Sequence, residues 1–185
     1  MRGRLLAAAI TVIVGLWGVP ANAAGTTTVD HFNDGPFPDN ICGISGTVTF
    51  RGTSVVREGP DGTFFASGTF WGVFTADNGK STTLFTAGPS KQTTASVIDE
   101  EAGTVTLTVT NVGLPEKLSI THGPTLIRDA GTVTFTYVFE YSGDRDDPLG
   151  DLISRDYHDL HGPHPDLVSD FELFCDVLVP YLQDP

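Results

Sequence analysis

The chain contains only two cysteines, one methionine and ten lysine or arginine residues among its 185 positions. Two cysteines cannot build a disulfide-dense miniprotein or an all-cysteine zinc site. With 23 acidic residues the formal net charge is -13, so the chain has no long-range attraction for polyphosphate and we expect no nucleic-acid partner. The length and the 39% hydrophobic content suit one globular domain.

Long apolar runs are also lacking, apart from the one at the N-terminus. Leu5 to Val19 follows the basic residues Arg2 and Arg4 and precedes Ala21-Asn22-Ala23, a small-x-small cleavage pattern. These features predict a signal peptide over residues 1–23. The apolar run falls short of the ~20 residues that span a bilayer, so we expect a secreted, extracellular protein with no membrane span in its mature form.

Secretion determines how the two cysteines are interpreted. Cys42 lies near the start of the predicted folded region and Cys175 lies near the end of the sequence. In an oxidising compartment two cysteines most simply form one disulfide. A catalytic thiol is the alternative, but no signature of an activating base surrounds either residue.

Several segments show the period-two alternation of half-buried strands, with threonine opposite apolar residues. They are Gly46–Phe50, Thr69–Thr75, Thr104–Thr110 and Thr132–Tyr141. In the second of these, Phe70 and Phe74 share one side of the strand and Trp71 lies on the other, which suggests that both faces are covered.

Turn signals separate these runs. Asp77-Asn78-Gly79-Lys80 predicts a type I′ hairpin, Gly59-Pro60-Asp61-Gly62 another turn, and Glu101-Ala102-Gly103 and Asp129-Ala130-Gly131 each precede a strand. Turns at this spacing predict a mainly β fold with about eight short antiparallel strands between Ile44 and Tyr141. A small closed barrel is favoured over a sandwich, because the strands carry few lysines to protect open edges.

The two ends of the sequence lack this alternation. Residues 24–40 are predicted to be flexible, and 41–185 to form a single β-rich domain that includes an acidic loop at 142–166. A 3–4 spacing of apolar residues from Val168 to Leu178 predicts a short C-terminal helix that ends at Pro180. A continued strand is the alternative. Cys175 would link this helix to the N-terminal region.

Six short segments, together with this layout, resemble a group of small secreted actinobacterial all-β proteins of unknown function. They are Cys42, Asn78-Gly79-Lys80, Gly113-Leu114-Pro115-Glu116-Lys117, Arg128-Asp129-Ala130-Gly131, Gly162-Pro163-His164-Pro165 and Phe174-Cys175-Asp176-Val177-Leu178. The resemblance spans most of the mature chain, but it implies no activity and no catalytic residues.

Recognisable catalytic motifs are absent from the sequence. There is no Gly-x-Ser-x-Gly elbow and no His-Glu-x-x-His pair. Oxygen-rich side chains at Asp144, Asp146, Asp147 and Asp151 suggest a weak Ca²⁺ site, although the spacing fails the EF-hand pattern. His158 and His161 would share a face if they lay on a helix, and are the second candidate pair of metal ligands. We expect no other cofactor.

Aromatic residues concentrate in consecutive predicted strands, and they fill the core or line a cavity. Phe70, Trp71, Phe74 and Phe85 are the candidate ligand-binding residues. The favoured function is a secreted non-enzymatic β-domain that binds a partner or a small apolar ligand. An extracellular hydrolase with its site in the 140–166 loop and a purely structural extracellular protein are the alternatives.

Overall fold

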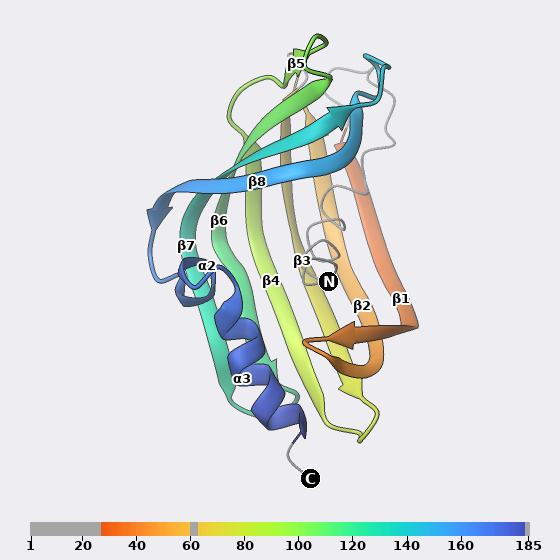
Figure 1. Cartoon of the computed structure of the whole chain (residues 1–185), viewed down its shortest axis with the longest axis vertical. Helices are drawn as coiled ribbons and strands as arrows, with labels where there is room; N and C mark the ends of the chain where they lie inside the picture. Colours follow the sequence, from red (N-terminus) through yellow and green to blue (C-terminus); the bar gives the residue numbers. More distant parts are fainter. Residues whose placement is uncertain (1–26, 60–62, 184–185) are drawn as a thin grey trace.

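The structure, a computed structural model, describes residues 27–59 and 63–183, so the predicted signal peptide and residues 60–62 of one predicted turn lie outside it. Eight antiparallel strands form one sheet in the order β1-β2-β3-β4-β6-β7-β8, with β5 paired to β6 (Figure 1). The strands are β1 (Thr27–Ile41), β2 (Ile44–Glu58), β3 (Phe64–Ala76), β4 (Ser81–Gln92), β5 (Val97–Asp99), β6 (Thr104–Ile120), β7 (Thr125–Tyr141) and β8 (Leu149–His161).

The mainly β prediction is confirmed, but the closed barrel is wrong, and so is the sandwich. The strands form a single open sheet whose edges are β1 and β8. Most of them are also longer than predicted, at 12 to 17 residues. The edges are protected by acids and prolines rather than lysines: β1 carries Pro36 and Pro38, and β8 carries the exposed Asp151 and Asp156.

Both segments that were predicted to be irregular contain a long strand. The part of 24–40 that the structure describes belongs to β1, which pairs with β2 along most of its length, so the predicted flexibility is wrong there. The predicted acidic loop at 142–166 is mostly β8, which pairs with β7. Neither strand shows clean alternation in sequence, because both are edge strands with mostly exposed side chains.

Three glycines with positive φ lie in neighbouring strands of the sheet, which curves around its concave face (Figure 1). Gly88 in β4, Gly113 in β6 and Gly131 in β7 have φ of +139°, +112° and +132°, and Gly113 pairs with Gly131. A Cβ on Gly131 would overlap the carbonyl oxygen of His161. Glycine is therefore needed at this point, where β7 and the end of β8 approach closely. The predicted turn at Asp129–Gly131 is wrong, because these residues lie inside β7.

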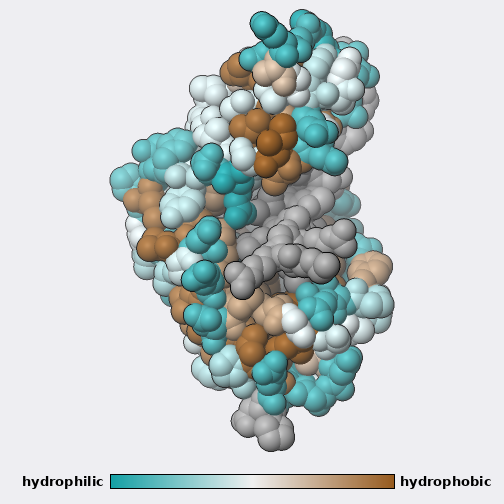
Figure 2. Space-filling model, in the orientation of Figure 1, coloured by the Kyte–Doolittle hydropathy of each residue, from teal (hydrophilic) through white to brown (hydrophobic). Residues whose placement is uncertain are grey.

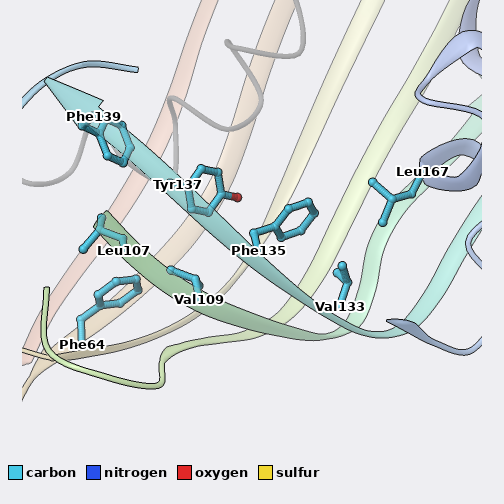
Figure 3. Close-up of a cluster of buried hydrophobic side chains, with 8 residues drawn as sticks. All are labelled: Phe64, Leu107, Val109, Val133, Phe135, Tyr137, Phe139 and Leu167. Carbon is cyan, nitrogen blue, oxygen red and sulfur yellow. The ribbon is translucent and has the colours of Figure 1, made fainter. Parts of the chain in front are cut away.

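The core covers one face of the sheet in two clusters of buried side chains. The first cluster includes Leu107 and Val109 of β6 together with Phe135 and Tyr137 of β7. Figure 3 shows these side chains along the two strands, with Leu167 approaching from the C-terminal segment. The predicted alternation of β6 and β7 is therefore confirmed, and one face of each strand is buried.

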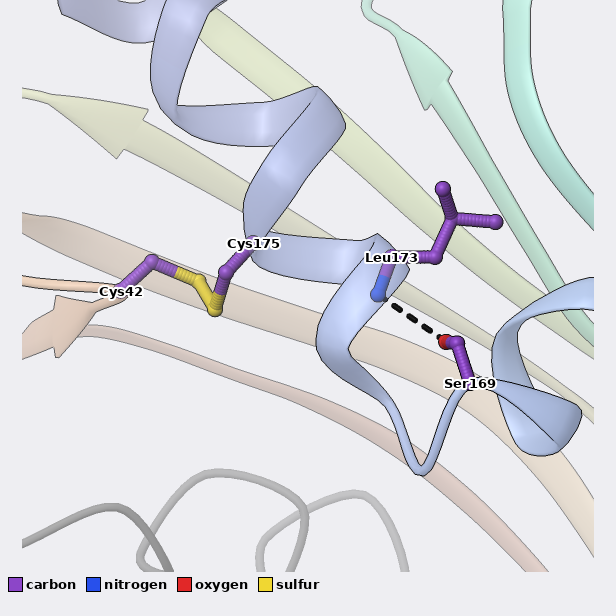
Figure 4. The surroundings of a disulfide bond; sticks show 4 residues. All are labelled: Cys42, Ser169, Leu173 and Cys175. Carbon is purple, nitrogen blue, oxygen red and sulfur yellow. Dashed lines mark hydrogen bonds between the residues drawn. A yellow bond between two sulfur atoms is a disulfide. The ribbon is translucent and has the colours of Figure 1, made fainter.

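The C-terminal segment folds as two helices, α2 (Pro165–Val168) and α3 (Glu172–Gln183). The Ser169 hydroxyl accepts a hydrogen bond from the backbone N–H of Leu173 at 3.0 Å, which satisfies a free donor in the first turn of α3 (Figure 4). The predicted helix end at Pro180 is wrong, because α3 continues to Gln183. Beyond Pro180, Leu182 is buried in the second core cluster together with Leu178 one turn earlier, and this packing holds the last turn in place.

The predicted disulfide is confirmed. Cys42, in the turn between β1 and β2, is bonded to Cys175 of α3, with the two Cα atoms 5.5 Å apart across a sequence separation of 133 residues (Figure 4). The bond fastens α3 to one end of the sheet. It therefore fixes a helix over the face on which the core lies.

The predicted β3–β4 hairpin is also present, but its turn is of another type. The N–H of Gly79 donates to the carbonyl of Ala76 at 2.8 Å, and Gly79 has φ +86°. Asn78 is not among the described residues with positive φ, so this is a type I turn followed by a left-handed glycine rather than type I′. Among the described residues, no helix is long and apolar enough to cross a membrane.

Candidate ligand site

Two neighbouring cavities lie over the side of the sheet on which the helices pack. One has a volume of about 180 Å³ and lies between β2, β3, β4, β6, β7 and the α2 region. The other, of about 700 Å³, lies between β1, β2, β3 and α3, and the disulfide forms part of its wall. Four residues line both cavities, namely Phe70, Leu84, Glu116 and Phe171. The two spaces therefore adjoin each other.

The walls of the smaller cavity are mainly apolar and aromatic. Phe135, Val133 and Leu167 of the first core cluster face it. Phe32 extends from the edge strand β1 and lies 6.2 Å, centroid to centroid, from Phe70. Lining that is mainly apolar and aromatic is typical of sites for small organic ligands.

One charged side chain on this wall comes from β8. The guanidinium of Arg155 lies 4.7 Å from the ring centroid of Phe171 and 5.7 Å from that of Phe135, within cation–π range of both. The Arg155 side chain thus forms part of the cavity wall, packed against these two rings. Its guanidinium places a positive charge at that wall.

Three carboxyl groups, those of Glu116, Asp129 and Asp166, lie close together at the smaller cavity. Glu116 of β6 is directly opposite Asp129 of β7 in the strand register, and both line the smaller cavity. Asp129 is only 3% exposed, and its carboxylate accepts hydrogen bonds from the backbone N–H groups of Asp166 (3.1 Å) and Leu167 (3.2 Å). Asp129 therefore attaches the start of α2 to the sheet. Its carboxylate does what an N-cap side chain normally does, although Asp129 belongs to β7 and not to the segment before the helix.

Burial of this cluster changes its acid–base properties. Burial, assisted by repulsion from Asp166 and Asp129, raises the pKa of Glu116 from 4.5 to about 8. Burial also raises the pKa of Asp166 to about 6, although the nearby backbone of Phe174 opposes this effect and Asp129 adds to it. Near neutral pH the Glu116 carboxyl therefore keeps its proton, and the cluster holds a proton that an exposed glutamate would lose.

Some polar atoms of the cluster have no hydrogen-bond partner among the described residues. They are one carboxyl oxygen of Glu116, both carboxyl oxygens of Asp166 and the Nδ1 atom of His164. Asp166 is 0% exposed and His164 only 3% exposed, so bulk water does not solvate them freely. Since buried polar groups in folded proteins are normally hydrogen-bonded, these atoms mark a place where a partner is expected.

The aromatic residues predicted as ligand-binding are divided between the two faces of the sheet. Phe70 lines both cavities and Phe74 lines the larger one. Trp71 and Phe85 are not among the lining residues; they face each other across β3 and β4 with their ring centroids 4.7 Å apart. The structure therefore places two of the four at the cavities and two on the opposite face.

The predicted metal ligands do not come together. Asp144, Asp146 and Asp147 lie in the turn between β7 and β8, where the Asp144 carboxylate accepts the backbone N–H of Asp146 at 2.9 Å. Asp151, His158 and His161 lie on β8, so the helix that would have placed the two histidines on one face is absent there. Within residues 27–59 and 63–183, no three His, Cys, Asp or Glu side chains are arranged to hold one metal ion.

Glu116, Asp129, His164 and Asp166 were not predicted as a site, although three of the quoted segments contain the first three of these residues. The signal for Asp129 was present: counting back in twos from Val133 on the buried face of β7 reaches it. An acid on such a face is an informative exception. No equivalent signal marks Glu116, because the strand pairing shifts between Gly113 and Glu116.

On the face shown in Figure 2, hydrophobic residues form several small patches that hydrophilic residues separate. In comparisons with known proteins, no family model, no curated protein and no solved structure matches this chain. The assignment of a site therefore depends on the geometry of the cavities alone.

Proposed function

We propose that the protein is a secreted, non-enzymatic β-domain that binds a small, mostly apolar ligand in the cavities over the concave face of its sheet. The observation that carries the proposal is the smaller cavity, whose walls are apolar and whose polar groups gather in one place. A site of this kind supplies affinity through apolar burial and orients the ligand through a few polar contacts.

Secretion is part of the proposal and rests on the predicted signal peptide together with the disulfide. A disulfide between Cys42 and Cys175 persists in an oxidising compartment and is rare in the cytosol. The resemblance to small secreted actinobacterial proteins is consistent with this compartment.

The first experiment is native mass spectrometry of the mature protein purified from culture medium. We expect added mass of a few hundred daltons or less that is lost on denaturation. If only the bare protein is found, benzyl alcohol and a hydrophobic fluorescent dye are titrated into it. Failure of all these probes to bind would contradict the proposal and favour a purely structural role.

A pair of neighbouring residues in β3 provides a matched test of the location. Phe70 lines both cavities, whereas Trp71 lies on the opposite face of the same strand. We expect Phe70→Ala to weaken binding of the probe at least tenfold, since it removes a large apolar contact, while Trp71→Ala leaves it unchanged. Equal effects of the two substitutions would place the ligand elsewhere.

A second candidate function is hydrolysis, and the observation that favours it is the Glu116 carboxyl. A glutamic acid that stays protonated near neutral pH, beside further carboxylates in a cavity, has the properties of a general acid. This location differs from the 140–166 loop predicted from sequence, which supplies only His164 and Asp166. Turnover of aryl glycosides or esters that Glu116→Gln abolishes would support this candidate over the binding protein.

A further inference from the structure

The polar groups on the wall of the smaller cavity indicate which polar group the apolar ligand carries. Glu116, Asp129 and His164 all line it, and they come from β6, β7 and the segment before α2. Asp166, which is fully buried, follows His164 by two residues and adds a further carboxyl group to the same cluster. Arg155, which also lines the cavity, carries a positive charge.

His164 is oriented so that one of its ring nitrogens has nothing to bind. Its Nε2 atom is 3.2 Å from the carbonyl oxygen of His161, which can only accept, so Nε2 carries the hydrogen and donates it. In the neutral ring Nδ1 is then an acceptor, and it has no partner among the described residues although the side chain is 3% exposed. This atom can therefore accept a hydrogen bond from a bound molecule.

The neighbouring groups require the same kind of partner. One carboxyl oxygen of Glu116 is also unpartnered, and the oxygens of Asp129, each of which accepts one backbone N–H, retain further lone pairs. The wall therefore presents three acceptor side chains and a concentration of carboxyl groups. A primary ammonium carries three N–H donors, no acceptor and a positive charge, and so matches this wall.

We infer that the smaller cavity binds a small primary amine with an apolar body, and that Glu116, Asp129 and His164 hold its ammonium group. The inference rests on the proposed ligand-binding function and specifies the class of ligand. The apolar body lies against the aromatic walls. The volume of about 180 Å³ suits one ring with a short arm, since an apolar cavity of about 150 Å³ holds benzene.

An amine satisfies this wall better than the alternatives do. A metal ion is not favoured, because it needs ligand atoms within about 2.0–2.6 Å of one point, and no three His, Cys, Asp or Glu side chains of the described residues are so placed. An ammonium makes longer contacts, since its hydrogen bonds to oxygen or nitrogen measure about 2.7–3.2 Å. An anionic ligand would place its charge beside Glu116, Asp129 and Asp166 and would be repelled. A neutral alcohol offers a single donor, so it would leave most of the acceptors unsatisfied.

The test uses isothermal titration calorimetry on the mature, disulfide-bonded protein. It compares benzylamine with benzyl alcohol, which have the same ring and arm and differ only in the ammonium or hydroxyl group. Benzoate is the control of opposite charge. We expect benzylamine to bind at least tenfold more tightly than benzyl alcohol, and benzoate not to bind. Equal affinity of the amine and the alcohol would overturn the inference while leaving the proposed function intact, whereas no binding of either would overturn the proposed function itself.

Glu116→Gln provides the matched variant, because it keeps the size of the side chain and removes its capacity for negative charge. We expect it to reduce the preference for benzylamine over benzyl alcohol at least fivefold, with binding of the alcohol retained. Thermal unfolding checks that the variant is folded. An unchanged preference in the folded variant would contradict the role of this wall.

A measurement on the unaltered protein keeps the inference testable if the variant does not fold. Near neutral pH the Glu116 carboxyl holds a proton in the free protein, and an ammonium beside it favours the ionised form. Titrations of benzylamine in two buffers with different ionisation enthalpies should therefore show release of a proton on binding. The other titratable or charged groups that face the site are Asp129, Tyr137, Arg155, His164 and Asp166. Binding without any proton release would count against the assigned contact with Glu116.

Discussion

The side-chain amide of Asn78 donates a hydrogen bond of 2.6 Å to the carbonyl oxygen of Leu182, 104 residues further along the chain. Asn78 belongs to the β3–β4 turn and Leu182 to the last turn of α3. Beside it, the ammonium of Lys80 donates to the carbonyl of Tyr181 at 3.1 Å. The hairpin thus satisfies two carbonyls at the end of α3, which lacks basic residues in its own last turn.

Asn78→Asp tests this contact separately from the turn. The new carboxylate still accepts the N–H of Lys80, as the Asn78 side chain does at 3.1 Å, but it loses the donor to Leu182 and places a negative charge at the carbonyl end of α3. We expect the free energy of unfolding to fall by about 1–2 kcal/mol in urea denaturation. Asp77→Asn, an exposed neighbour, is the control and should change it by less than about 0.5 kcal/mol.

Removing the disulfide should be costly because of the long loop that it closes. Cys42 and Cys175 are separated by 133 residues, and the chain-entropy model gives about 5 kcal/mol for a loop of this length. We expect the double variant Cys42→Ser, Cys175→Ser to unfold at much lower urea than the oxidised protein. Addition of a reductant should destabilise the original chain and leave the double variant unaffected; an equal effect on both would show that the bond contributes little.

Glu116 should make the stability depend on pH. Its pKa in the folded protein, about 8, exceeds the ordinary 4.5, so between these values the folded state holds a proton that the unfolded chain has lost. The free energy of unfolding should therefore fall as the pH rises from about 5 to about 8, by about 3–5 kcal/mol from this group. Asp166, with its pKa raised to about 6, adds a fall in the same direction at the lower end of this range.

Urea denaturation between pH 5 and pH 9 measures this dependence. In Glu116→Gln the slope between pH 6 and pH 8 should be much flatter, because the amide does not titrate. Glu101→Gln, at an exposed position between β5 and β6, is the matched control and should retain the slope of the original protein. Identical slopes in all three proteins would rule out a raised pKa at Glu116.

The three glycines with positive φ in β4, β6 and β7 should not tolerate a side chain. Gly131 combines φ of +132° with a Cβ position that overlaps the carbonyl oxygen of His161. We expect Gly131→Ala to cost more than about 3 kcal/mol in urea denaturation, since β7 and the end of β8 would have to separate. Gly103→Ala is the comparison, because Gly103 also has positive φ, +66°, but nothing lies within 4 Å of its Cβ position. It should cost only about 1–2 kcal/mol; if the two costs are equal, the close approach at Gly131 is unimportant.

Local sequence signals predicted the parts of the fold that depend on neighbouring residues. The alternation from Thr132 to Tyr141 identified the buried face of β7, and Asn78-Gly79 identified a hairpin. The disulfide followed from the count of cysteines. Whether the sheet closes depends on contacts between its first and last strands, and no local pattern records that, so the open sheet was not predicted.

The candidate site was harder to predict because irregular backbone determines which side chains reach it. Counting in twos from Leu107 along β6 would place Pro115 and Lys117 on the concave side. The shift in pairing between Gly113 and Glu116 instead brings Glu116 opposite Asp129. His164 and Asp166 reach the same place only because α2 folds back against β7, where Asp129 accepts the backbone N–H of Asp166.

The disulfide has a further consequence for the order of assembly. All strands from β2 to β8 lie between Cys42 and Cys175, so they must all be synthesised before the two sulfur atoms can meet. Most sheet neighbours are consecutive in the chain and can pair as they emerge. With only two cysteines, a single chain also has no mispaired isomer to rearrange. The covalent bond can therefore form only after all of these strands have been synthesised, and an oxidant without an isomerase should suffice to form it.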